Sequence, residues 1–217
     1  MLAIAGVIML GSCEQETYDT GTGDLSFTRG DLLEAHADNN KTIVAVTTDS
    51  DEQLILTNPY NAKWVTTADS TYRVMAYYDK TGEGAARLVS MRLVPTLIPV
   101  AIEEIETPKT DPIRFESLWV SDNRKYVNIG FYIMTGTPDD DAKAVQTLGA
   151  MYEGVTIHNN GTTTAKITIY HDQGGVPEYY STRYYASLPV STLHDADSLT
   201  LVINSYKGRI VKTCSLR

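Results

Sequence analysis

Residues with reactive side chains are scarce in this chain of 217 residues. The two cysteines stand at positions 13 and 214, and the four histidines, His36, His158, His171 and His194, are scattered with no i,i+4 pair. A zinc site needs three or four converging ligands, and no such set is visible. The chain also has no Gly-x-Ser-x-Gly elbow, no phosphate loop with a lysine and no Gly-x-Gly-x-x-Gly turn. We therefore expect no metal, no cofactor and no enzymatic activity.

Basic residues are outnumbered as well. The chain has 18 Lys and Arg against 27 Asp and Glu, which gives a net charge of −9. A chain with this balance is repelled by phosphate backbones, so we expect no nucleic-acid partner. The run Asp139-Asp140-Asp141 lacks the ligand spacing and the glycine of an EF-hand, and it is predicted to be a solvated loop.

The amino-terminal region predicts a membrane anchor. Residues 2–11 form an apolar run that is too short to span a bilayer but has the length of a signal-peptide core. The following Leu10-Gly11-Ser12-Cys13 resembles the lipobox of bacterial lipoproteins. The resemblance implies a signal peptide over 1–12 and covalent lipid on Cys13, whose several acyl chains would give lasting attachment. No Lys or Arg precedes the run, which favours a natural start a few residues upstream of Met1.

Residues 13–26 would then be a lipidated, flexible tether. The stretch that follows Cys13 carries four acidic residues between positions 14 and 24 and has no apolar periodicity, as expected for an extended spacer. Acylation of Cys13 leaves Cys214 as a free thiol. Because it alternates with apolar neighbours, Cys214 is predicted to be a small buried residue on the last strand.

Most of the remaining chain reads as short β-strands. In the first half, strand-like runs at 42–47, 53–57, 71–78 and 87–94 are separated by turn signals, a pattern that suits a small barrel. Residues 97–112 contain three prolines and four acidic residues and interrupt this alternation. We therefore predict a barrel domain over 27–98, a linker over 99–112 and an antiparallel β-sandwich over 113–217.

The second half shows cleaner alternation. In each of three runs, the apolar residues fall on one face of the expected strand. These sets are Val127, Ile129, Phe131 and Ile133; Ile167 and Ile169; and Leu199, Leu201 and Ile203. Tight turns are predicted at Gly174-Gly175, at 159–161 and at 207–208. Residues 139–152 fit either a strand or a helical face.

Tyrosines are concentrated at one place, and they form the candidate binding surface. If 179–185 is a strand, Tyr180 and Tyr184 share one face while Tyr179 and Tyr185 share the other, so one of Tyr184 and Tyr185 should be buried and the other exposed. Exposed tyrosines make rigid contacts with sugars or proteins. The alternative is ordinary cross-strand packing. Trp64 is a second candidate contact residue.

The order of these segments resembles a known family. The stretch from Ile167 to Tyr180 (ITIYHDQGGVPEYY) precedes Ser187-Leu188-Pro189-Val190 and Asp197-Ser198-Leu199, and Trp119 and Tyr126-Val127-Asn128-Ile129 come before them. This order is similar to that of the NigD-like lipoproteins of Bacteroides-type bacteria, although Asp172 stands where Asn is more common. The resemblance implies an N-terminal OB-like barrel, a C-terminal β-sandwich and a place in the cell envelope, with the outer membrane expected.

The family name comes from a bacteriocin operon, which implies an immunity role for at least one member, and the resemblance supplies no catalytic residues. Our leading hypothesis is a non-catalytic envelope lipoprotein whose β-domains bind a partner protein. A glycan-binding accessory protein at the cell surface, using 179–185 or Trp64, and a bacteriocin-immunity protein are the alternatives.

Overall fold

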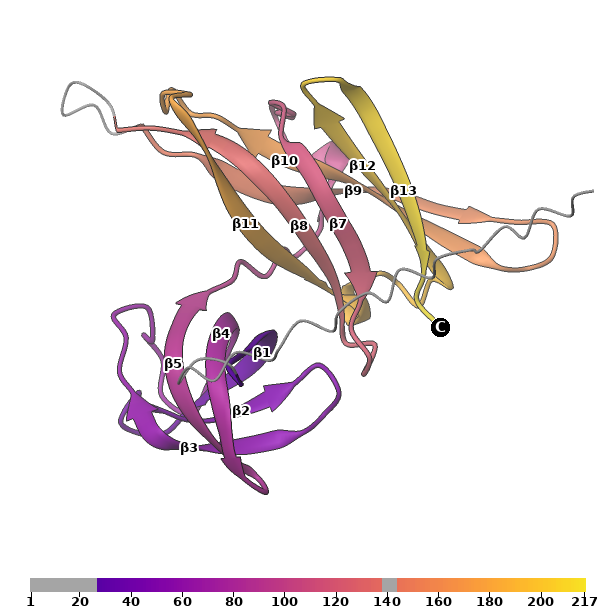
Figure 1. Cartoon of the computed structure of the whole chain (residues 1–217). Helices are drawn as coiled ribbons and strands as arrows, with labels where there is room; N and C mark the ends of the chain where they lie inside the picture. Colours follow the sequence, from indigo (N-terminus) through magenta and orange to yellow (C-terminus); the bar gives the residue numbers. More distant parts are fainter. Residues whose placement is uncertain (1–26, 138–143) are drawn as a thin grey trace, which may run out of the picture.

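The computed structural model describes residues 27–137 and 144–217, which form a β-barrel and a β-sandwich in succession (Figure 1). The predicted signal peptide, Cys13, its tether and Asp139–Asp141 lie outside the described residues. In the part of the chain that is described, no helix is long and apolar enough to cross a bilayer.

Five strands close the first domain into a barrel. They are β1 (Arg29–Ala37), β2 (Ile43–Thr48), β3 (Gln53–Tyr60), β4 (Thr71–Gly82) and β5 (Ala85–Leu93). Their order around the barrel is β1-β2-β3-β5-β4, with β4 pairing back on β1 and with β3 parallel to β5. A closed five-stranded barrel of this kind confirms the OB-like domain.

Alternation along the strands fills the barrel. Val74, Ala76 and Tyr78 of β4 point inward and are almost fully buried, and they pack with apolar residues of the other strands. The phenol of Tyr78 donates to Asp31 at 2.9 Å. Burial and this hydrogen bond raise the pKa of Tyr78 well above its usual range.

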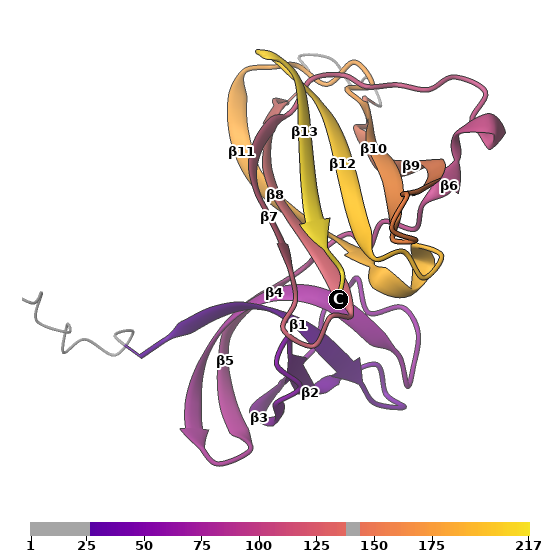
Figure 2. The same cartoon turned by 90° about the vertical axis from the view of Figure 1, so that its right-hand side faces the viewer.

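Two sheets form the second domain (Figure 2). One has the order β11-β8-β7, built from β7 (Arg114–Val120), β8 (Tyr126–Thr135) and β11 (Tyr180–Pro189). The other has the order β13-β12-β10-β9-β6, built from β6 (Val100–Ala101), β9 (Thr147–Ile157), β10 (Thr163–Asp172), β12 (Ser198–Ser205) and β13 (Gly208–Ser215). The predicted sandwich is confirmed, but β10/β12 and β6/β9 are parallel pairs rather than antiparallel ones.

The predicted inward faces form the sandwich core. All nine side chains of the three predicted sets lie in one buried cluster, namely Val127, Ile129, Phe131, Ile133, Ile167, Ile169, Leu199, Leu201 and Ile203. Thr147 begins a strand, so the helical alternative is wrong for 147–152. Cys214 lies on the last strand as expected but is only partly buried, and its burial raises the pKa of the thiol.

The segment 99–112 lies along the sandwich. Val100 and Ala101 form β6 on the edge of the larger sheet, followed by the 3-10 turn η1 (Ile102–Glu104). Farther on, the His171 amide donates to the Lys109 carbonyl and the Asp111 amide donates to the His171 carbonyl. The prolines and charges of this segment suggest an open linker. In the structure, however, both of its ends pair with the sandwich.

Candidate binding site between the two domains

A buried arginine joins the barrel to the sandwich. Arg73 of β4 is 4% exposed, and its guanidinium makes a bidentate pair with Asp49 at 2.6 and 2.7 Å. The same group donates to Ser187 of β11 at 3.1 Å and to Asn128 of β8 at 3.0 Å. It also lies 4.2 Å from the ring centroid of Tyr126. Since Ser187 and Asn128 are fully buried, this arginine has exchanged water for partners in both domains.

A second set of polar contacts borders this arginine. Glu34 of β1 accepts hydrogen bonds from the Tyr126 phenol at 2.9 Å and from Lys125 at 3.3 Å. Asn123 donates to Asp51 at 3.0 Å from the other side of the junction. Burial, with the hydrogen bond to Glu34, raises the pKa of Tyr126 to about 12. The hydrogen bond to Glu34 is also the main reason that the pKa of Lys125 is raised. The two domains therefore meet through directional contacts, which fix one relative orientation.

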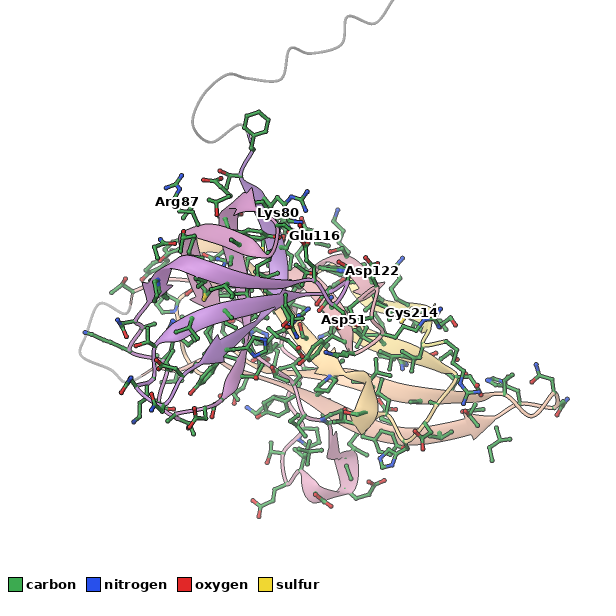
Figure 3. All side chains as sticks on the ribbon, turned by 90° about the horizontal axis from the view of Figure 1, so that it is seen from below. Asp51, Lys80, Arg87, Glu116, Asp122 and Cys214 are labelled. Atoms are coloured by element: carbon green, nitrogen blue, oxygen red, sulfur yellow. The ribbon has the colours of Figure 1, made fainter. Side chains whose placement is uncertain are left out.

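A pocket of about 360 Å³ opens where the domains meet. The barrel contributes the start of β1, the β2–β3 turn and Met75 of β4, and the sandwich contributes residues 119–122 and Tyr185. Figure 3 shows Asp51 and Asp122 at the border between the barrel and sandwich ribbons. We call this the interdomain pocket.

Aromatic rings line the sandwich wall of the interdomain pocket. Trp119 of β7 is 36% exposed, and its ring meets Tyr185 of β11 edge to face with 6.2 Å between the centroids. Between these two strands lies Gly130 of β8, and a Cβ there would stand 2.4 Å from the Ser117 hydroxyl and 3.3 Å from the Tyr185 ring. In the barrel, Gly30 lines the pocket and the ring of Tyr77, outside the lining, lies over it: a Cβ on Gly30 would stand 2.8 Å from that ring. Gly30 thus leaves room for the Tyr77 ring, and Gly130 leaves room chiefly for the Ser117 side chain.

The predicted tyrosine cluster divides between two places. Tyr179 and Tyr180 are 63% and 55% exposed at the start of β11, at the end of that strand away from the barrel. Tyr184 is on the inner side of the sheet, stacked on Phe131 at 6.4 Å, yet it remains 38% exposed. Tyr185 faces outward and is partly buried. The two do point to opposite faces, but neither belongs to the core, because this part of β11 is the open edge of its sheet.

Trp64, the other predicted contact residue, lies in the β3–β4 connection of the barrel. Its ring packs edge to face on Tyr72 at 5.5 Å and rests on the barrel core. It does not line the interdomain pocket. Trp64 therefore packs on the barrel core, away from the interdomain pocket.

The histidines stay apart from one another. The ring of His36 bonds to Thr47 and Thr71, that of His158 to Thr164 and that of His171 to the Asp111 carbonyl, while His194 packs on the Tyr152 ring. Within 27–137 and 144–217, no three metal-ligating side chains come together.

Sequence reasoning missed most of the pocket. Asp49 and Met75, which line it, and Arg73 and Tyr77, which lie beside it, were not singled out, and Trp119 appeared only as part of a family pattern. Alternation in β4 could have pointed to Arg73 and Tyr77, since both occupy outward positions that alternate with the inward Val74, Ala76 and Tyr78. It could not show that a second domain would cover one of them and leave the other exposed.

The fold defines the class of this protein: a two-domain, all-β protein with an OB-like barrel and a sandwich. No family model and no curated protein matches the chain. Among solved structures, a NigD-like immunity protein from Bacteroides caccae matches with a TM-score of 0.65 and 20% identity, over 85% of this chain and 91% of that one.

Two further structures match to a similar degree. A protein from Parabacteroides distasonis, assigned provisionally as toxin-related, has a TM-score of 0.64 and 12% identity over 86% of this chain and 92% of that one. A protein from Bacteroides fragilis, assigned provisionally as a lipoprotein, has a TM-score of 0.60 and 12% identity over 88% and 98%. The resemblance to NigD-like lipoproteins is therefore confirmed for the fold.

Proposed function

We propose that this protein is a non-catalytic lipoprotein of the bacterial cell envelope, anchored through Cys13, that binds a partner protein at the interdomain pocket. The anchor is supported by the Leu-Gly-Ser-Cys step and by the fold shared with the provisionally assigned lipoprotein of Bacteroides fragilis. The outer membrane is the membrane we expect.

One observation carries the binding role: partly exposed aromatic rings stand in a pocket whose two walls are joined by the buried hydrogen bonds of Arg73 to Asn128 and Ser187. A site that is formed before its ligand arrives loses little conformational entropy on binding. The outer face of the β11-β8-β7 sheet continues this wall with Tyr132, Arg114 and Arg183. Trp, Tyr and Arg are the residues that contribute most to protein–protein contacts, which favours a protein partner.

Capture from membranes with the acylated chain tests the proposal. We expect the partner to be captured by the wild type and lost with the double variant Trp119→Ala/Tyr185→Ala. The matched control is Tyr206→Ala, which removes an exposed ring from the β12–β13 turn, outside the pocket. The melting temperature of each variant is measured alongside. Capture that survives the double variant would show that the pocket is not the binding site.

The anchor has its own test. Cys13→Ala should abolish labelling by a clickable fatty acid and release the chain from membranes. Labelling that persists in this variant would contradict lipidation at Cys13.

Two alternatives keep specific support. Trp119 and Tyr185 also suit stacking on a sugar ring, which favours a glycan-binding accessory protein at the cell surface. The immunity function given for the Bacteroides caccae protein favours a toxin as the partner. Recovery of a surface glycan or of a toxin in the capture experiment identifies either one.

A further inference from the structure

The charges around the interdomain pocket leave one carboxylate in excess. Its lining contains one basic side chain, Arg29, and four acidic ones, Asp31, Asp49, Glu52 and Asp122. Two of the four have partners from outside the lining, because Arg73 pairs with Asp49 and Lys80 pairs with Glu52. Arg29 and Asp31 both act on the Tyr78 phenol, which donates to Asp31, so one positive charge stands near that carboxylate.

Asp122 is the remaining acidic group. It is exposed in the turn between β7 and β8, three residues after Trp119, and within the described residues it has no ion pair. One additional positive charge would therefore neutralise the lining side chains and their ion-pair partners; Arg92 of β5 lies near the Tyr185 phenol but outside this lining.

The rings around the pocket show what kind of cation this surface accommodates. On the outer face of the β11-β8-β7 sheet, arginines lie over three tyrosines: Arg73 over Tyr126 at 4.2 Å, Arg114 over Tyr132 at 3.7 Å and Arg183 over Tyr185 at 5.0 Å. Trp119 is on the same face, and in the described parts of the chain no cation lies over its ring. Indole is the ring that binds cations best.

The pocket size limits the ligand. At about 360 Å³ it lies near the lower end of the roughly 300–1,000 Å³ of small-ligand sites. Such a volume suits one extended side chain better than a branched oligosaccharide. A guanidinium can stack on the indole and also bond a carboxylate with two parallel hydrogen bonds, which an ammonium cannot do.

We infer that the interdomain pocket receives the side chain of an arginine from the partner protein, with its guanidinium against Trp119 and Asp122. This inference rests on the proposed function and names the chemistry of the partner. The excess carboxylate sets the sign of the charge, and the indole provides the flat surface. Both groups stand on the sandwich wall, three residues apart in the chain.

Peptide titration followed by NMR tests the inference directly. The probe is acetyl-Gly-Arg-Gly-amide, and its neutral counterpart carries citrulline in place of arginine. The chain has two tryptophans, so Trp64→Phe assigns the indole signal of Trp119. We expect the arginine peptide to shift this signal in a saturable way and to bind about tenfold more tightly than the citrulline peptide.

Variants locate the interaction. Trp119→Leu should weaken the arginine peptide about tenfold, and Asp122→Asn about threefold, as expected for an exposed charge pair. The control Glu103→Gln removes one negative charge from the exposed turn η1, outside the pocket, and should change nothing. Equal affinity for the arginine and citrulline peptides, no binding of either, or an equal shift of the Trp119 signal by maltose would overturn the inference.

The same variants distinguish a failure of the arginine inference from a failure of the proposed binding function. If capture of the membrane partner is lost with Trp119→Ala/Tyr185→Ala but is unchanged by Asp122→Asn, the arginine assignment is wrong and the binding function stands. If capture persists in both, the binding function at this pocket is wrong as well.

Discussion

At the scale of single residues, Arg73 matters most for the relation between the two domains. Its side chain points outward from a barrel strand, and the sandwich covers it with Asn128 and Ser187. A buried ion pair contributes little net stability compared with an apolar replacement, but breaking it leaves a charge without its partner. The pair holds the Arg73 guanidinium in place, and its hydrogen bonds to Asn128 and Ser187 then fix the sandwich wall relative to the barrel wall.

Arg73→Met should therefore lower the free energy of unfolding by about 3–5 kcal/mol, because Asp49, Asn128 and Ser187 lose their shared donor. Lys80→Met is the control, since Lys80 and Glu52 are 30% and 39% exposed and such a pair contributes no more than about 1 kcal/mol. Urea unfolding of the three proteins measures both effects. An Arg73→Met variant as stable as the wild type would show that the junction does not depend on this group.

Tyr126 predicts a dependence on alkaline pH. Its pKa is raised to about 12 in the folded chain, whereas an unfolded tyrosine titrates near 10. The folded state therefore holds the proton more tightly, so the stability that Tyr126 contributes is complete below pH 10 and is lost as the pH rises through 12. Unfolding free energies measured across this range should fall less steeply in Tyr126→Phe than in the wild type. Tyr78, whose pKa is also raised, accounts for part of the fall that remains in Tyr126→Phe. Equal slopes for the variant and the wild type would show that the pKa of Tyr126 is not raised by folding.

At the scale of elements, the turns hold the strands in place. The β10–β11 connection contains Gly174 and Gly175, both with positive φ, of 58° and 75°. They differ in their surroundings. A Cβ on Gly174 would stand 2.0 Å from the backbone oxygen of Val145, while a Cβ on Gly175 would have nothing within 4 Å.

These two glycines make a matched pair of variants. Gly175→Ala should cost about 1–2 kcal/mol, the strain of a left-handed conformation. Gly174→Ala should cost more than about 3 kcal/mol, because a backbone oxygen cannot turn aside as a side chain does. Thermal or urea unfolding measures the difference. Equal losses would show that the 145–146 backbone moves freely away from this turn.

At the scale of the whole molecule, the contacts across the junction make the two domains one body. The chain crosses from barrel to sandwich through residues 94–97, where the Leu97 amide donates to the Ser187 carbonyl and the Ser187 amide donates to the Pro95 carbonyl. Residues 99–112 then pair with the sandwich.

Limited proteolysis of the wild type should leave a single resistant core that spans residues 94–113, since paired backbone is cleaved slowly. In Arg73→Met the domains lose their main connection, and two fragments should accumulate. Mass spectrometry of the products identifies the cut sites. Early cleavage of the wild type between 99 and 112 would show that this segment is an open linker after all.

The sequence by itself determined the all-β class, the barrel followed by a sandwich, and the inward faces of β8, β10 and β12. It could do so because alternation with a period of two is a local signal: whichever face is apolar must be buried. The same locality explains the limits at β11. Alternation placed Tyr184 and Tyr185 on opposite faces, but it could not show that β11 would lie at a sheet edge, where neither ring is fully covered.

Tertiary structure alone decided the interdomain pocket. Arg73 and Asp49 of the barrel meet Asn128 and Ser187 of the sandwich across 55 to 114 positions of the chain, and no local pattern connects residues so far apart. Whether an outward residue is buried or exposed depends on which surface of the other domain faces it. The long-range packing of two separately formed domains therefore fixes the site, while short-range alternation fixes the domains themselves.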